Sequence, residues 1–169
     1  MKKFFCSILI LIILYGCKGS GKLAGKIAEG VGKGFANAVG ESMVKTGSEA
    51  IAKSFSNQNK VSKQQALWET ASEMNKSTPI QIDQETMLNN VSVEGNGLVF
   101  NYELINYLSF QVDPKQLFHN ISPVVQNSLC STPDTKLALR KGVSFSYCYF
   151  GNDNRFIMKF IIEPADCGY

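Results

Sequence analysis

The sequence is poor in the side chains that most often carry catalysis or bind metals. Its 169 residues include one histidine, His119, and acidic residues such as Asp83 and Glu103 occur singly. A zinc site or a nucleophilic triad needs several such side chains together, and a cysteine nucleophile needs a neighbouring base. We therefore expect no catalytic residue, no metal, no other cofactor and no nucleic-acid partner, in a protein that is not an enzyme.

The sequence also lacks an apolar run long enough to cross a membrane as a helix. Such a span takes about 20 residues, whereas the run that starts at Phe4 ends near Cys17. Lys2 and Lys3 precede it, and the small residue Gly16 stands directly before Cys17. A positive head, a short apolar core and a small residue at the end are the parts of a secretory signal peptide.

The segment Leu14-Tyr15-Gly16-Cys17 resembles the lipobox of a bacterial prolipoprotein, although Tyr15 is bulkier than the residue usual there. The resemblance covers the first 17 residues. It implies that residues 1–16 are a signal peptide that is removed, and that lipid on Cys17 anchors the chain to the cell membrane. Lys18 replaces the aspartate that retains many such proteins at an inner membrane, which implies an outer-membrane address facing the periplasm if the cell has two membranes. An ordinary secretory signal, cut elsewhere, is the alternative.

Residues 17–60 form a glycine-rich basic segment. Apolar residues recur there at every fourth position, which predicts an amphipathic helix with a membrane-facing stripe. Small residues spaced four apart also favour self-association of such a helix, and hence a homo-oligomer. Each glycine costs a helix about 1 kcal/mol relative to alanine, so a flexible tether is the competing interpretation. The stripe consists of Leu23, Ile27, Val31, Phe35, Val39 and Met43.

The net charge of the chain changes sign near residue 60, where the glycine-rich segment ends. Residues 1–60 carry nine lysines against three glutamates, whereas residues 61–169 carry a net negative charge. A basic segment next to a lipid anchor should lie along anionic lipid. The simpler alternative is that these lysines keep an apolar helix soluble.

Residues 61–169 have the pattern of one α+β domain. A helix is expected over residues 61–75, and a second helix begins at Asp113-Pro114, a cap residue followed by a first-turn proline. Alternating apolar residues predict one hairpin over 87–104 and another over 143–162. The expected order is αββαββ, with a small antiparallel sheet covered on one face by the two helices.

Three cysteines fall in this domain, and strand geometry favours one pairing. Cys148 lies near the turn of the last hairpin, whereas Cys167 follows the far end of its second strand. About ten extended residues span about 30 Å, and bridged Cα atoms must lie within about 7 Å. We therefore predict a disulfide between Cys130 and Cys167, and a packing role for Cys148.

The last hairpin also supplies the best candidate binding site. Phe150, Ile157 and Ile161 should lie on the sheet face away from the helices, and an uncovered apolar strip usually marks a docking surface. The leading hypothesis is a lipid-anchored envelope protein, non-catalytic, whose α+β domain binds a protein partner in an assembly, pilot, exclusion or immunity role. The alternative is a membrane-active or self-associating lipoprotein that acts through residues 21–55.

Overall fold

The protein is represented by a computed structural model that describes residue 51 and residues 62–169. Cys17 and the apolar stripe from Leu23 to Met43 lie outside the described residues, so the lipid anchor, the membrane-facing helix and the homo-oligomer remain predictions. Ile51 is helical and only 3% exposed, and it belongs to the main hydrophobic core.

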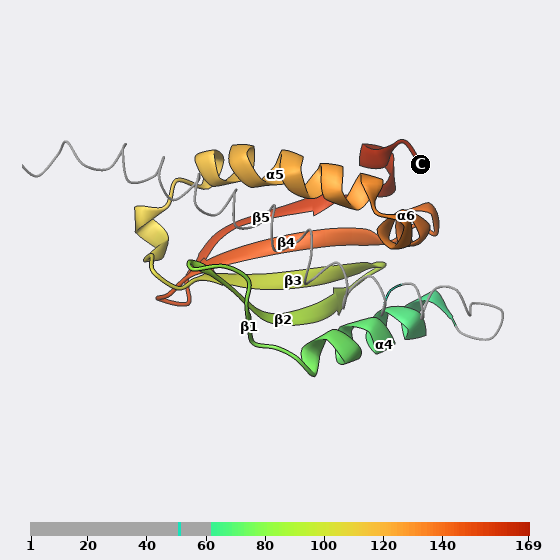
Figure 1. The fold of residues 1–169 in the computed structure, drawn as a ribbon, viewed down its shortest axis with the longest axis horizontal. Helices are drawn as coiled ribbons and strands as arrows, with labels where there is room; N and C mark the ends of the chain where they lie inside the picture. The colour runs from blue at the N-terminus through green and yellow to red at the C-terminus, as the bar shows by residue number, and fades with distance from the viewer. Residues whose placement is uncertain (1–50, 52–61) are drawn as a thin grey trace, which may run out of the picture.

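The described part is an α+β domain of five strands and three helices (Figure 1). This confirms the expected α+β class, with one helix more than the two that the sequence analysis predicted. Two short 3-10 turns, η2 and η3, follow β3 and β5. The elements are α4 (Lys63–Asn75), β1 (Ile80–Gln81), β2 (Thr86–Glu94), β3 (Gly97–Leu104), η2 (Ser109–Gln111), α5 (Pro114–Ser131), α6 (Pro133–Arg140), β4 (Ser144–Gly151), β5 (Phe156–Ile162) and η3 (Pro164–Cys167).

The two longer helices begin at the polar residues that cap them. The Ser62 side chain accepts a hydrogen bond from the backbone N–H of Gln65 at 3.2 Å, and the Asp113 carboxylate accepts one from that of Lys115 at 2.9 Å. Such bonds satisfy N–H groups that have no partner within the first turn of a helix. α5 contains Pro123 within its length.

The sheet is mixed, and the expectation of an antiparallel sheet is wrong at its centre. The strand order is β1-β2-β3-β4-β5; β3 and β4 are parallel, whereas the other pairs are antiparallel. Parallel neighbours need a long crossover, usually helical. The chain between Leu104 and Ser144 contains α5 and α6, which return it to the end of the sheet where β3 began.

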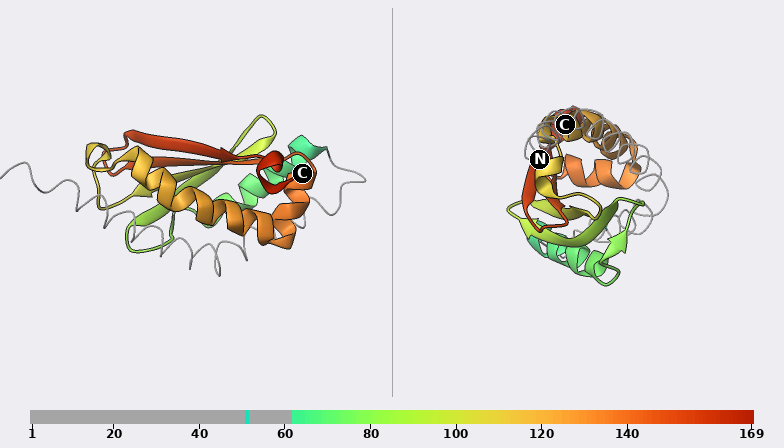
Figure 2. Two further views of the ribbon diagram at one scale, coloured as in Figure 1. Left: turned by 90° about the horizontal axis from the view of Figure 1, so that it is seen from above. Right: turned by 90° about the vertical axis from the view of Figure 1, so that its left-hand side faces the viewer.

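All three helices contribute to one core on a single face of the sheet, so the helices and the sheet form two layers (Figure 2). Aromatic rings from neighbouring strands stack across this face. The Tyr147 ring centre lies 5.3 Å from that of Phe100 and 5.1 Å from that of Phe160, and Tyr102 stacks on Tyr149 at 5.2 Å. The opposite face carries no helix within the part of the chain that the structure describes.

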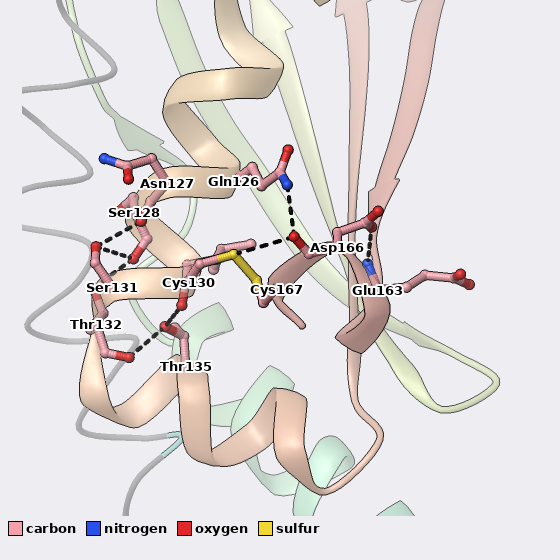
Figure 3. The surroundings of a disulfide bond; sticks show 11 residues. Gln126, Asn127, Ser128, Cys130, Ser131, Thr132, Thr135, Glu163, Asp166 and Cys167 are labelled. Atoms are coloured by element: carbon pink, nitrogen blue, oxygen red, sulfur yellow. Dashed lines mark hydrogen bonds between the residues drawn. A yellow bond between two sulfur atoms is a disulfide. The ribbon is translucent and has the colours of Figure 1, made fainter. Parts of the chain in front are cut away.

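The disulfide between Cys130 and Cys167 confirms the predicted pairing (Figure 3). Cys130 lies in the last turn of α5 and Cys167 in η3, with their Cα atoms 5.3 Å apart. Beside the bridge, the Gln126 side chain donates a hydrogen bond to the backbone oxygen of Asp166 at 2.8 Å. The bridge and this bond hold the end of the chain against α5.

Candidate partner-binding surface

Exposed large apolar side chains gather around β5. Six such side chains are exposed among the described residues, and four belong to β5 or to η2 and α5, which contact it. We call these four the β5 surface: Phe110 (78% exposed), Phe118 (42%), Phe156 (58%) and Ile161 (46%).

Strand alternation explains why β5 has both buried and exposed apolar residues. Met158, Phe160 and Ile162 face the helices and are buried, whereas Ile161 points to the uncovered face. Phe156 begins the strand, and its ring meets that of Phe150 edge to face at 5.8 Å. The uncovered face of the hairpin therefore presents Phe150, partly buried, beside the more exposed Phe156 and Ile161.

The placement of Ile157 on that open face is wrong. Ile157 is 8% exposed and belongs to the main core. The pairing of β4 with β5 shifts by one residue here, because Tyr149 pairs with Met158 while Phe150 pairs with Phe156. An extra residue in one strand interrupts its alternation, so Ile157 turns inward, and Phe156 takes the exposed position. Unbroken alternation, on which the sequence argument relied, gave no signal of this bulge.

Phe118 lies on the helix-covered side of β5. Its ring packs edge to face on that of Phe160, with centres 5.8 Å apart, yet it remains 42% exposed. The preceding residue, Leu117, is buried in the core. The apolar side of α5 is therefore wider than the part of it that the sheet covers, and Phe118 forms its uncovered margin.

Phe110 lies in η2, which polar contacts of the neighbouring Ser109 hold close to the beginning of β5. Ser109 donates two hydrogen bonds to the carboxylate of Asp153, from its backbone N–H at 3.2 Å and its hydroxyl at 2.9 Å. Desolvation raises the pKa of this carboxyl, but the hydrogen bonds from Ser109 and Arg155 outweigh it and leave the pKa below its ordinary value. These bonds fasten η2 to the β4–β5 turn, so the exposure of Phe110 does not depend on a loose loop.

An ion pair on the uncovered face joins the middle of β5 to the end of β2. The Lys159 ammonium lies 2.7 Å from the carboxylate of Glu94, which ends β2. The bridge passes over β3 and β4, and the thiol of Cys148, in register with Lys159, is buried beneath it. Burial raises the pKa of this thiol, with opposing effects from Lys159 and Glu94. A thiol held in its protonated form packs and is a poor nucleophile.

Neither a metal site nor a membrane span occurs in the part of the chain that the structure describes. Within residue 51 and residues 62–169, no group of three or more His, Cys, Asp or Glu side chains could hold a metal ion. The same residues include no helix of the length and apolarity that a membrane crossing requires. His119 is exposed beside Phe118, with ring centres 5.8 Å apart.

Comparison with known proteins identifies a shared fold but no family. No family model and no curated protein matches the chain. A crystal structure of a candidate secreted protein from Pseudomonas aeruginosa aligns with a TM-score of 0.52 at 20% identity, over 62% of this chain and 92% of that one. At this identity the match shows a common fold.

Two more distant likenesses are to pilotins of type II secretion systems. The pilotin of Vibrio vulnificus aligns with a TM-score of 0.49 at 12% identity, over 73% of this chain and 96% of that one. The pilotin of Vibrio cholerae aligns with a TM-score of 0.45 at 10% identity, over 75% and 100% of the two chains. These scores describe a distant resemblance.

Proposed function

We propose that this protein is a non-catalytic, lipid-anchored protein of the cell envelope that binds a protein partner through the β5 surface. The observation that carries the proposal is the concentration of exposed apolar side chains around one edge strand. Soluble domains rarely leave such side chains grouped unless the group serves an interaction, and aromatic residues are enriched where proteins bind each other. A role in assembly, piloting, exclusion or immunity fits such a binding module.

The anchor in this proposal is lipid on the thiol of Cys17. It rests on the lipobox-like residues that precede this cysteine, and it would hold the domain next to the membrane, facing the periplasm of a two-membrane cell. We expect Cys17→Ser to abolish acylation and to leave the protein out of the membrane fraction. The measurement is mass spectrometry of the native N-terminus together with membrane fractionation. A mature wild-type N-terminus without acyl mass would contradict the anchor.

The binding role predicts a specific loss when the β5 surface is altered. We expect the double variant Phe156→Ser/Ile161→Thr to weaken partner binding at least about tenfold, because central apolar anchors carry most of an interface's affinity. Its folding free energy should change by less than about 2 kcal/mol, since each of the two side chains is about half exposed. The measurement is photo-crosslinking in native membranes, with a photoreactive amino acid at position 110, at the margin of this surface.

Trp68 supplies the matched control. It is 57% exposed on α4, which packs against β2 and β3 rather than β5. Trp68→Ser should leave the crosslinked product unchanged. Equal yields from the wild type and the Phe156→Ser/Ile161→Thr variant would refute the proposed surface, as would a product lost equally in the Trp68→Ser control.

A further inference from the structure

The outer edge of β5 is open. β5 is the last strand of the sheet and pairs with β4 alone. Within the described residues, no backbone hydrogen bond joins β5 to any element other than β4. An edge strand presents the N–H and C=O groups of alternate residues outward, which forms a template for another extended chain.

The opposite edge of the sheet is closed in two ways. β1 pairs with the beginning of β2 at Met87 and Leu88. Further along β2, the Asn75 side chain donates a hydrogen bond to the backbone oxygen of Val91 at 2.7 Å and accepts one from its N–H at 2.7 Å. The amide of Asn75 thus takes the place that another strand would occupy. The described residues give β5 no such cap.

Apolar side chains flank the open edge on both faces of the sheet. Phe118 borders it on the helix-covered face, and Phe156 and Ile161 border it on the other. Side chains of an extended segment alternate between the two faces of a sheet. A strand laid along β5 would therefore bring apolar residues against both groups while its backbone pairs with that of β5. A helix could contact the side chains, but it has no free backbone groups to pair with the edge.

A second copy of this chain is a poor occupant of the edge. Lys159 is the central residue of β5. An antiparallel pair of two β5 strands in full register sets Lys159 opposite its own copy, and like charges directly opposite each other destabilise a pair of strands.

We propose that the partner adds a β-strand to the outer edge of β5, supplying an extended segment with apolar side chains on both of its faces. This inference rests on the proposed function and specifies the form in which the partner binds. Backbone pairing would give the affinity, and the β5 surface would select the side chains.

The test uses the full-length lipidated protein in detergent and the partner segment that crosslinks to position 110, mapped by mass spectrometry. The segment is synthesised in three forms. One is unmodified, one is N-methylated at its odd-numbered residues, and one is N-methylated at its even-numbered residues. N-methylation removes the N–H donors that face one side of a strand and keeps every side chain. We expect one methylated peptide to lose at least tenfold in affinity and the other to bind within about twofold of the unmodified peptide. Hydrogen exchange at β5 amides should slow when the unmodified peptide binds.

Other outcomes of this experiment would overturn either the strand addition or the proposed function. If both methylated peptides bind as well as the unmodified one, or β5 amides gain no protection, strand addition is wrong while the binding surface stands. If the crosslinked segment comes from a second copy of this chain, the choice of a different partner is wrong. If no protein crosslinks at position 110, the proposed function fails, and the strand addition fails with it.

Discussion

Replacing both Cys130 and Cys167 with serine should lower the free energy of unfolding by about 3–4 kcal/mol in the loop-entropy model. The bridge joins residues 37 apart in sequence and closes a loop that contains α6, β4 and β5. Without it, the unfolded chain gains conformational freedom that the folded chain does not share. The end of η3 also loses its covalent attachment to α5. Urea unfolding of the wild type and the double variant measures the difference.

The unpaired thiol provides the control for this experiment. Cys148 is buried but forms no bridge, so Cys148→Ala removes one cysteine and leaves the loop closed. It should cost about 1 kcal/mol, the effect of losing a small buried apolar group. Reductant should destabilise the wild type as much as the double substitution does, and should not affect the double variant. If the wild type unfolds at the same urea concentration with and without reductant, the bridge contributes little.

Phe160→Ala should lower the free energy of unfolding by about 3–5 kcal/mol, the usual cost of truncating a buried phenylalanine. The Phe160 side chain is 6% exposed. Its ring stacks on Tyr147 at 5.1 Å and on Tyr149 at 6.4 Å, and Phe118 packs against it edge to face at 5.8 Å. Removing the ring leaves a cavity between the sheet and α5. Chemical denaturation followed by near-ultraviolet circular dichroism reports both the stability and the aromatic packing.

Phe156→Ala is the matched comparison, because it makes the same truncation in the same strand. Phe156 is 58% exposed and contacts one ring, that of Phe150, among the described residues. Its loss should cost about 1 kcal/mol or less. Equal losses for the two variants would show that the orientation of β5 described above is incorrect.

The sequence predicted the features that depend on local pattern. Alternation located both hairpins, and capping residues such as Asp113 located the helix starts. The Cys130–Cys167 bridge was predictable because the length of a strand fixes how far apart its ends lie. The parallel pairing of β3 with β4 was missed, because alternation shows which residues share a face and does not show in which direction two strands run.

The candidate surface was predicted only in part. The exposure of Ile161 and Phe150 on the uncovered face follows from alternation. The burial of Ile157 and the exposure of Phe156 depend on a bulge that no residue in the sequence indicates. Phe118 was not among the residues that the sequence analysis predicted for this surface. Its exposure depends on how far the sheet extends beneath α5, which is a property of the assembled domain.

The parallel contact between β3 and β4 has a consequence for how the domain matures. The two central strands are neighbours in space, but α5 and α6 lie between them in the chain. Contacts between distant parts of a chain form slowly, since a long loop must close first. The chain through β4 must therefore be free to fold before the middle of the sheet can assemble. A product that stops before Ser144 would keep the β2–β3 hairpin without its central neighbour, and isolated hairpins are marginally stable at best.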